Sequence, residues 1–416
     1  MTAAAVGYLQ LLRQNPDFRR LWLAEVVSYL GDWFNTIALF TAVAALSGRT
    51  EAMSAVFVAK MLPVFFMTPV AGPLIDRFDR KKLLVATDLA RAVAALGLVV
   101  AYRLGSIELL VAILFVMVAF SGIFIPAKNS VLPQITSEGE LGTANALSAG
   151  TWSVMLAFGA ALGGLVTGVV GVEAALVIDA ATFVLSALLL VPLPVLVAER
   201  REHSDRSFRA GLRYLRDHPR VASSLCIKPL MALAGGGVAM LPVFGTRVFP
   251  GHSGPTWMGL LYAARGLGAL VGSLVVRRIL GDASPLMRRA IAPGFLVVAL
   301  AYLGLGQAQS IWQAAAGYFA TTVGSGMLWT YSSTLAGRES DNEVRGRIFA
   351  LEFGALTLTM AIAAGIAGAL VDRAGWAVRS IASATGVVLL LPAILWLVLL
   401  PWLERSAPEV PVVEPE

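Results

Sequence analysis

Nine ionisable side chains interrupt long apolar stretches of this sequence, and packing alone explains them poorly. They are Glu25, Asp32, Lys60, Asp88, Arg91, Asp179, Lys228, Arg265 and Glu352. A charge near the centre of a bilayer costs about 2.5–3.5 kcal/mol on insertion scales, so each must pair, reach water or take part in transport. The chemistry to expect is therefore proton exchange or ion pairing, and the depth and helix face of each residue indicate which.

Asp32 lies near the midpoint of the first apolar stretch and belongs to a polar stripe. Glu25 and Ser28 precede it by seven and four residues, and Asn35 and Thr36 follow it by three and four, so all share one helical face. Such a stripe should face a water-filled cavity rather than lipid. Desolvation disfavours a charged carboxylate, so Asp32 could exchange a proton as the cavity opens to alternate sides. A structural acid in a permanent ion pair remains the alternative.

Arg265 is the expected counter-charge of Asp32, because it lies at a similar depth in the second half of the chain. An arginine keeps its charge, so it must pair, reach water or bind an anionic group. A static bridge would join the halves, whereas one displaced by substrate or proton would couple transport, and both remain open. Lys60, about two turns below the external end of its helix, either extends to the membrane surface or lines the cavity.

Four other intramembrane charges have structural interpretations. Asp88 and Arg91 are three residues apart and can pair along one helix. Asp179 is expected to be structural for similar reasons. Lys228 is near enough to the cytoplasmic end of its helix to extend its ammonium group to the membrane surface.

Composition places these charges in a polytopic helical membrane protein. The chain of 416 residues is 57% hydrophobic and 14% charged, with a mean hydropathy of +0.77, whereas a soluble domain carries about 25% charged residues. The basic residues behind the net charge of +6 are scattered over short loops, so we expect the lipid bilayer and no nucleic acid as partner.

One cysteine, Cys226, excludes an internal disulfide, and three widely spaced histidines argue against a metal site. No cleavage site follows a short apolar core at the N-terminus, so we expect the first span to be retained.

Twelve apolar stretches are long enough to cross a hydrocarbon core about 30 Å thick. The expected helices are 20–46, 53–75, 83–103, 107–127, 141–169, 173–194, 221–248, 256–279, 290–307, 311–336, 347–371 and 379–401. With the N-terminus inside, most of the 32 lysines and arginines fall in cytoplasmic segments, and the few external ones are Arg49, Arg103, Arg247, Arg373 and Arg379. The positive-inside rule therefore places both termini in the cytoplasm.

The two halves of the chain are related. FSGIFIPAKNSVLP around Ser121 and VGSGMLWTYSSTLAG around Ser325 are offset by 204 residues, and Gly31-Asp32-Trp33 falls on Gly235-Gly236-Gly237 at the same offset. We therefore expect an all-α membrane protein of twelve helices in two pseudo-symmetric six-helix bundles. The expected boundaries are 1–194 and 221–402 for the bundles, 195–220 for a basic cytoplasmic linker and 403–416 for a cytoplasmic tail. Transporters built from such repeats bind substrate near mid-membrane between the halves.

The segment after the second helix, Gly72-Pro-Leu-Ile-Asp76-Arg77-Phe-Asp79-Arg80-Lys81-Lys82, resembles the cytoplasmic loop signature of the major facilitator superfamily. Within that superfamily the chain resembles the macrolide-efflux and siderophore-exporter type of drug:proton antiporter. The segments that carry this second resemblance are Asn15–Trp22, Pro126–Pro133, Leu141–Asn145, Ile178–Phe183, Gly211–Leu215 and Arg345–Ile348. The resemblance implies the major facilitator fold, alternating access, and a multi-pass protein of the bacterial cytoplasmic (inner) membrane.

Asp76 has a physical role that does not depend on the resemblance. Its carboxylate stands at a helix end and can face the positive N-terminal end of the eleventh helix, worth about 0.3–1 kcal/mol. Arg345 and Arg347, just before that helix, could pair with it. The resemblance implies that this cluster latches the cytoplasmic side in the outward-facing state. The expected gate residues are Gly72, Asp76, Arg77, Arg80, Lys81, Arg345, Arg347 and Glu352, with Glu25 on the same side, and anchoring of the topology is the alternative for Arg80 and Lys82.

Two positions depart from the family pattern. Asp79 stands where the loop signature has a glycine, which adds a charge. The fifth helix lacks the Gly-Pro pair of the antiporter pattern and carries Gly159, Gly163, Gly164 and Gly168 instead. Small residues at this spacing predict close packing against the eighth helix.

The expected function is proton-coupled export of amphipathic small molecules by a monomer that needs no cofactor beyond the proton gradient. An adaptable apolar pocket would bind the substrate, and its candidate residues are Phe34, Met61, Phe65, Met240, Trp329 and Tyr331. A lysophospholipid or siderophore exporter is one alternative, and a non-transporting receptor or scaffold is another. The sequence has no phosphate-binding G-x-x-x-x-G-K-[ST] loop and no H-E-x-x-H or G-x-S-x-G motif, which argues against an ATP-driven pump and an enzyme.

Overall fold

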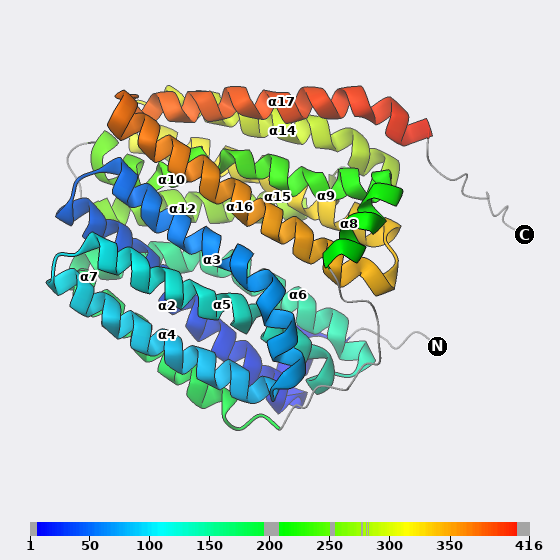
Figure 1. The fold of residues 1–416 in the computed structure, drawn as a ribbon, viewed down its shortest axis with the longest axis horizontal. Helices are drawn as coiled ribbons and strands as arrows, with labels where there is room; N and C mark the ends of the chain where they lie inside the picture. Colours follow the sequence, from blue (N-terminus) through cyan, green and yellow to red (C-terminus); the bar gives the residue numbers. More distant parts are fainter. Residues whose placement is uncertain are drawn as a thin grey trace, which may run out of the picture.

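The computed structural model describes residues 6–194, 208–249, 254–275, 278–279, 281 and 283–405, and the secondary structure in these ranges is helical (Figure 1). The elements are α1 (Tyr8–Gln14), α2 (Pro16–Leu46), α3 (Thr50–Arg77), α4 (Arg80–Arg103), α5 (Ile107–Ile135), α6 (Glu138–Val154), η1 (Met155–Gly159), α7 (Ala160–Leu190), α8 (Phe208–Asp217), α9 (Pro219–Met231), η2 (Ala232–Ala234), α10 (Gly235–Ala239), α11 (Leu241–Val243), η3 (Phe244–Val248), α12 (Gly254–Leu270), η4 (Val271–Val275), α14 (Ser284–Gly306), α15 (Ile311–Glu339), α16 (Asn342–Ala374) and α17 (Val378–Arg405).

Polar residues just before the helices mark where several of them begin. The side chains of Asn15, Asp79 and Ser106 each accept a hydrogen bond from a first-turn backbone N–H of α2, α4 and α5. Ser137 and Glu140 form a capping box at the start of α6. These contacts satisfy N–H groups that have no partner within the helix. The structure thus assigns Asp79, the departure from the loop signature, to capping α4.

The described helices account for the twelve expected crossings. Nine spans are long and apolar enough to cross a membrane in the described part of the chain. One of them, Gly139–Leu190, is two crossings, because Gly171 has φ 83° and ψ 173° and breaks the helix. A glycine adopts this backbone conformation without strain. Together with α12 continued by η4, and with α15, this confirms the twelve-helix fold.

The fourth crossing is longer than predicted. The sequence indicates an end at residue 127, whereas α5 continues to Ile135 and includes Pro126 and Pro133. The prolines suggest a loop, but the buried side chain of Lys128 forms an ion pair that holds this segment inside the protein. The predicted loop position of Lys128 is therefore wrong.

The helices form two bundles, α2 to α7 and α9 to α17, which meet along α3 with α16 and α7 with α12. The boundary between them falls partly on residues 195–207, outside the described residues, so the exact domain limits remain a prediction. Figure 1 shows α17 ending and α8 lying at the same end of the molecule, which we call the terminal end. The ribbons of α3 and α16 lie close together at the opposite end, the far end, and diverge toward the terminal end.

Glycines bring the backbones of the two bundles into contact at α7 and α12. A Cβ atom on Gly164 would lie 2.9 Å from the Cα atom of Gly259, and one on Gly259 would lie 3.1 Å from Gly164 Cα. This confirms the predicted packing between the fifth and eighth crossings. Gly159 and Gly163 instead face α2, where a Cβ atom on either would lie within 3 Å of Trp33.

Candidate functional site

Asp32 lies in the middle of α2 and is only partly buried. Its carboxylate makes no hydrogen bond or ion pair with any residue that the structure describes. The charged side chains that interact electrostatically with Asp32 are Lys60 of α3, Asp88 and Arg91 of α4, and Asp179 of α7. A carboxylate in such surroundings can bind a proton without first breaking a bond.

Most of the predicted polar stripe does not face open water. Glu25, Ser28 and Asn35 are each at most 2% exposed inside the first bundle. Asn35 turns toward α7, whereas the Thr36 hydroxyl accepts a hydrogen bond from Lys60 Nζ at 2.6 Å. Apart from Asp32, the expected cavity-facing stripe is therefore an internal network, because its other four side chains each find a partner on a neighbouring helix.

Asp88 and Arg91 form the predicted local ion pair on α4, and both side chains are buried. The Ser186 hydroxyl donates to the second oxygen of Asp88 at 2.6 Å. The Arg91 guanidinium lies 4.4 Å from the ring centroids of both Phe124 and Phe183. These contacts fix the Arg91 charge in the bundle, as a structural pair requires.

Arg265 of α12 does not pair with Asp32 in this conformation. Its Cζ atom lies 6.0 Å from the ring centroid of Tyr262, and its buried Nε atom has no hydrogen-bond partner in the described ranges. The ring of Tyr262 lies 5.2 Å from that of Trp33, on the α2 helix that carries Asp32. An aromatic contact thus joins the bundles near these two charges, and each charge is left without a bonded counter-ion.

Glu25 belongs to a buried triad within the first bundle. It forms an ion pair with Lys128 of α5, and the Ser148 hydroxyl of α6 donates to Glu25 Oε2 at 2.9 Å. Only 2% of the Glu25 side chain and 9% of the Lys128 side chain is exposed. Glu25 therefore joins three helices of one bundle, and in this conformation it does not act as a gate between halves.

A matching triad lies in the second bundle. Lys228 Nζ of α9 is 2.7 Å from Glu352 Oε2 of α16, and the Ser332 hydroxyl of α15 is 3.1 Å from Glu352 Oε1. Ser332 and Glu352 lie 204 residues after Lys128 and Ser148, which is the offset between the halves. The predicted extension of Lys228 to the membrane surface is wrong, because a buried carboxylate binds its ammonium group.

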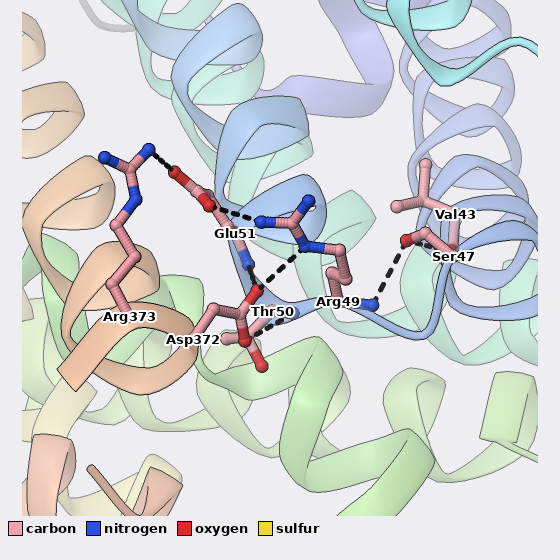
Figure 2. Close-up of polar contacts among 7 residues, drawn as sticks. All are labelled: Val43, Ser47, Arg49, Thr50, Glu51, Asp372 and Arg373. Carbon is pink, nitrogen blue, oxygen red and sulfur yellow. Dashed lines mark hydrogen bonds and ion pairs between the residues drawn. The ribbon is translucent and has the colours of Figure 1, made fainter. Parts of the chain in front are cut away.

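The far ends of α3 and α16 are joined by charged residues (Figure 2). The Asp372 carboxylate accepts hydrogen bonds from the backbone N–H groups of Thr50 at 3.2 Å and Glu51 at 2.8 Å. Arg373 pairs with Glu51, and Arg49 lies 2.8 Å from Glu51 and 3.7 Å from Asp372. We call these five residues the far-end latch. The Asp372 side chain, which belongs to the other bundle, caps the start of α3. Arg49, the residue just before α3, makes no capping hydrogen bond with its own side chain.

The far-end latch repeats the sequence of the predicted cytoplasmic gate. Gly368-Ala-Leu-Val-Asp372-Arg373 ends α16, and Gly72-Pro-Leu-Ile-Asp76-Arg77 ends α3 at the opposite end of the same helix pair. A Cβ atom on Gly368 would lie 2.5 Å from Ser54 Oγ and 3.1 Å from Glu51 Cα. The glycine thus permits close approach where the aspartate caps the neighbouring helix.

At the terminal end the same helices are apart. A Cβ atom on Gly72 or on Gly346 would have no atom within 4 Å, and the two ribbons are separated there (Figure 1). The Arg345 guanidinium donates to the carbonyl of Ser340 at 2.9 Å, just after α15. Arg347, in the first turns of α16, makes no ion pair with a described residue. Gly72 therefore makes no close contact with a described part of another helix in this conformation.

The other predicted gate residues bind within the first bundle or are exposed. Arg80 donates to a backbone carbonyl of α5 at 3.1 Å, and Lys81 donates to one just after α7 at 2.9 Å. These bonds hold both side chains within the first bundle in this conformation. Asp76 and Arg77 are exposed in the last turn of α3.

Three of the six predicted pocket residues are buried in the protein core: Phe34, Met240 and Tyr331. The Tyr331 hydroxyl donates to a backbone carbonyl at 3.1 Å, so substrate contact with these residues would require repacking, and the pocket stays a prediction. Trp329 is 41% exposed and lies over the Lys228 ammonium at 4.7 Å. Met61 and Phe65 are partly buried on α3.

In the described ranges no group of three or more His, Cys, Asp or Glu side chains could bind a metal ion.

Comparison with known proteins identifies relatives along the whole chain. A family model described as transmembrane secretion effector matches residues 9–416. The MFS-type transporter YkuC of Bacillus subtilis (strain 168) is 25% identical over 415 residues, which is 96% of each chain. The multidrug efflux pump Tap of Mycobacterium bovis is 28% identical over 63% of this chain and 65% of its own. The putative bacilysin exporter BacE of Bacillus subtilis (strain 168) is 25% identical over 63% of this chain and 66% of its own.

Solved structures share the fold at low sequence identity. The POT family transporter PepTSo has a TM-score of 0.76 at 12% identity and covers 94% of this chain and 99% of its own. A bacterial homolog of the human lysosomal transporter Spinster has a TM-score of 0.69 at 14% identity, with 95% and 99% covered. Both similarities support the arrangement of twelve helices in two bundles.

Proposed function

Since the chain belongs to the transmembrane secretion effector family of major facilitator transporters, we propose that it exports amphipathic small molecules in exchange for protons. The family consists of transporters rather than enzymes, and such transporters need no cofactor. Relatives named as a multidrug efflux pump and a putative bacilysin exporter support export as the direction.

The observation that carries proton coupling is the unpaired carboxylate of Asp32 in the middle of α2. An intramembrane carboxylate is costly, and here no bonded cation offsets its charge. Protonation removes that cost, so the site favours a bound proton whenever the pathway excludes water. Arg265, the unpaired cation of the other bundle, is the counter-charge that we expect to approach when the pathway closes around it.

We propose that the terminal end faces the cytoplasm of a bacterium, and that this conformation is inward-facing with its far-end latch closed. The concentration of lysines and arginines in segments at that end supports this orientation. No contact described here requires a second copy, and we expect a monomer.

The repeated Gly-x-Leu-x-Asp-Arg segments suggest how the two states alternate. We propose that Asp76 caps the N-terminus of α16 in the outward-facing state, as Asp372 caps α3 in this one. Arg77 would then pair near the start of α16, as Arg373 pairs with Glu51. Each latch closes when the other opens, because both act on the same two helices.

The test uses purified protein in liposomes with an imposed pH gradient and ethidium, an amphipathic cation, as the probe. We expect gradient-driven ethidium flux in the wild type and its loss in Asp32→Asn. Asp17→Asn is the matched control, because Asp17 lies partly exposed at the start of the same helix. Equal gradient-driven flux in wild type and Asp32→Asn would remove Asp32 from the coupling role. Absence of flux for a broad panel of amphiphiles would favour a receptor or scaffold.

A lysophospholipid exporter is the second candidate, and a groove on the bundle surface favours it. The groove has a volume of about 910 Å³ and opens beside the far-end latch, between α3 and α5. Arg49, Glu51 and Glu108 line one part of it, and apolar residues such as Val111 and Phe115 line another. This combination suits a charged headgroup with one acyl chain. The variant Ala112→Trp, which fills the groove, would lower lysolipid transport and leave ethidium flux unchanged if the second candidate holds.

A further inference from the structure

Asp179 of α7 is a fully buried carboxylate in an incomplete hydrogen-bond network. Its Oδ2 atom accepts a hydrogen bond from the Asn35 amide at 2.8 Å, but Oδ1 has no partner in the described part of the chain. The Oδ1 atom of Asn35 is also buried and without a partner. Two unpartnered acceptors in one buried site are costly, and a proton on the carboxylate relieves part of that cost.

The cations near Asp179 are bonded elsewhere. Lys60 of α3 donates to Thr36, and Arg91 of α4 pairs with Asp88. Both act on Asp179 only through longer-range electrostatics, together with the like charge of Asp32 on α2. On the α5 side of this site, the sulfur of Met117 lies 3.9 Å from the Asn35 amide nitrogen. No described cation therefore forms an ion pair with the Asp179 carboxylate.

Charge counting in this region leaves one carboxylate uncompensated. The acids linked here by electrostatic interactions are Asp32, Asp88 and Asp179, and the cations are Lys60 and Arg91. One proton makes the group neutral, and Asp88 is excluded as its binding site because it holds Arg91 and Ser186. The proton therefore belongs to Asp32 or Asp179, and Asp179 is the more deeply buried of the two.

We propose that Asp179 is a proton-binding residue of the transport cycle, and that Asp32 passes the proton between Asp179 and the pathway. The proposal rests on the proposed function. Protonated Asp32 would release its proton and Asp179 Oδ1 would accept it, so the total charge of the pair stays constant. The Asn35 amide, bonded to Oδ2, leaves Oδ1 as the atom that accepts the proton.

The close packing of α2 and α7 supports this arrangement. A Cβ atom on Gly31 would lie 2.7 Å from Asp179 Oδ1 and 1.9 Å from Thr182 Oγ1. Only a glycine allows the α2 backbone to approach the carboxylate this closely. Gly31 directly precedes Asp32, so this contact packs the α2 turn that carries Asp32 against the α7 turn that carries Asp179.

Infrared difference spectroscopy of the purified protein during a pH titration tests the proposal without a substrate. The carbonyl stretch of a protonated, buried carboxylic acid should grow in the wild type as the pH falls. We expect Asp179→Asn to lack this band, Asp179→Glu to show it at a shifted frequency, and Asp17→Asn to keep it unchanged. Asp32→Asn should change the pH at which the band grows, because a neighbouring charge is removed.

Persistence of the full band in Asp179→Asn would overturn the proposal. So would a wild-type band that responds to sodium but not to pH, since the site would then bind a metal cation. Asp179→Glu keeps the carboxylate. A shifted band in this variant would show that a substitution at position 179 does not remove the band simply by unfolding the protein. In liposomes, Asp179→Asn should lose the gradient-driven part of ethidium flux. A wild type without flux that still shows the Asp179 band would reject the proposed function and leave the proton site standing.

Discussion

Replacing Asp372 by alanine should weaken the far-end latch and shift the protein toward the opposite state. The Asp372 carboxylate, with 16% of its side chain exposed, accepts hydrogen bonds from two N–H groups at the start of α3. Once the far end opens, water can replace the carboxylate at those N–H groups. The cap therefore stabilises one conformation relative to the other, and not merely the helix.

The magnitude follows from capping energetics. Loss of an N-cap side chain costs about 0.5–2 kcal/mol. The attraction between the carboxylate charge and the helix N-terminus is part of the same contact, so this cost already includes it. The ion pair with Arg49 adds little, because 64% of the Arg49 side chain is exposed and solvent screens it. A total of about 1–2 kcal/mol changes a two-state population ratio about 5–30-fold.

Spin-label distance measurements in liposomes would measure this shift. The native cysteine, Cys226, is exposed and must first be replaced by serine. Labels at the exposed positions Leu104 and Ala377 report on the far end, and labels at Lys82 and Arg405 report on the terminal end. We expect Asp372→Ala to lengthen the far-end distances and shorten the terminal-end distances.

Glu173→Ala is the matched control. Glu173 pairs with Arg103 at the far end of the molecule, but both residues belong to the first bundle. Its removal should leave both distance distributions unchanged. If Asp372→Ala and Glu173→Ala give the same distributions, the latch has no influence on the conformational equilibrium and the reasoning from capping is refuted.

Three further predictions concern other contacts. Exchange of charge by Glu51→Arg together with Arg373→Glu should restore a far-end distance distribution that either change alone disturbs, and a failure of the double variant to do so would contradict a direct ion pair. Lys128→Ala leaves the carboxylate of Glu25 buried without a cation, so the free energy of unfolding should fall by about 3–5 kcal/mol, seen as a lower Tm in detergent. Gly31→Ala places a methyl group against Thr182 and should cost about 1–3 kcal/mol of stability, which the double variant with Thr182→Ala should partly recover in the same Tm assay.

Contacts along one helix or between small residues could be predicted from the sequence. Asp88 and Arg91 are three residues apart, so helix geometry alone brings them together. The glycines of the fifth crossing predict close helix packing, because small residues at this spacing along one helix let a neighbouring backbone approach. The twelve spans follow from apolar length, which the bilayer fixes.

Contacts between distant segments could not be predicted in this way. Lys128 and Glu25 are 103 residues apart, and nothing in either neighbourhood indicates the pairing. The expected Asp32–Arg265 pair rested on similar depth, which says nothing about which face of each helix is turned inward. Met240 and Tyr331 have the right chemistry for a pocket, but their burial depends on how the second bundle packs.

The two buried triads show what an internal duplication can preserve. In the first bundle the acid, the base and the hydroxyl come from Glu25, Lys128 and Ser148. In the second, the positions that correspond to Lys128 and Ser148 carry a hydroxyl and an acid, and the base has moved to the remaining helix. The residues at each position differ, yet every polar group in the set is satisfied. A comparison of the halves by residue identity therefore misses this correspondence, whereas a comparison by hydrogen-bond pattern shows it.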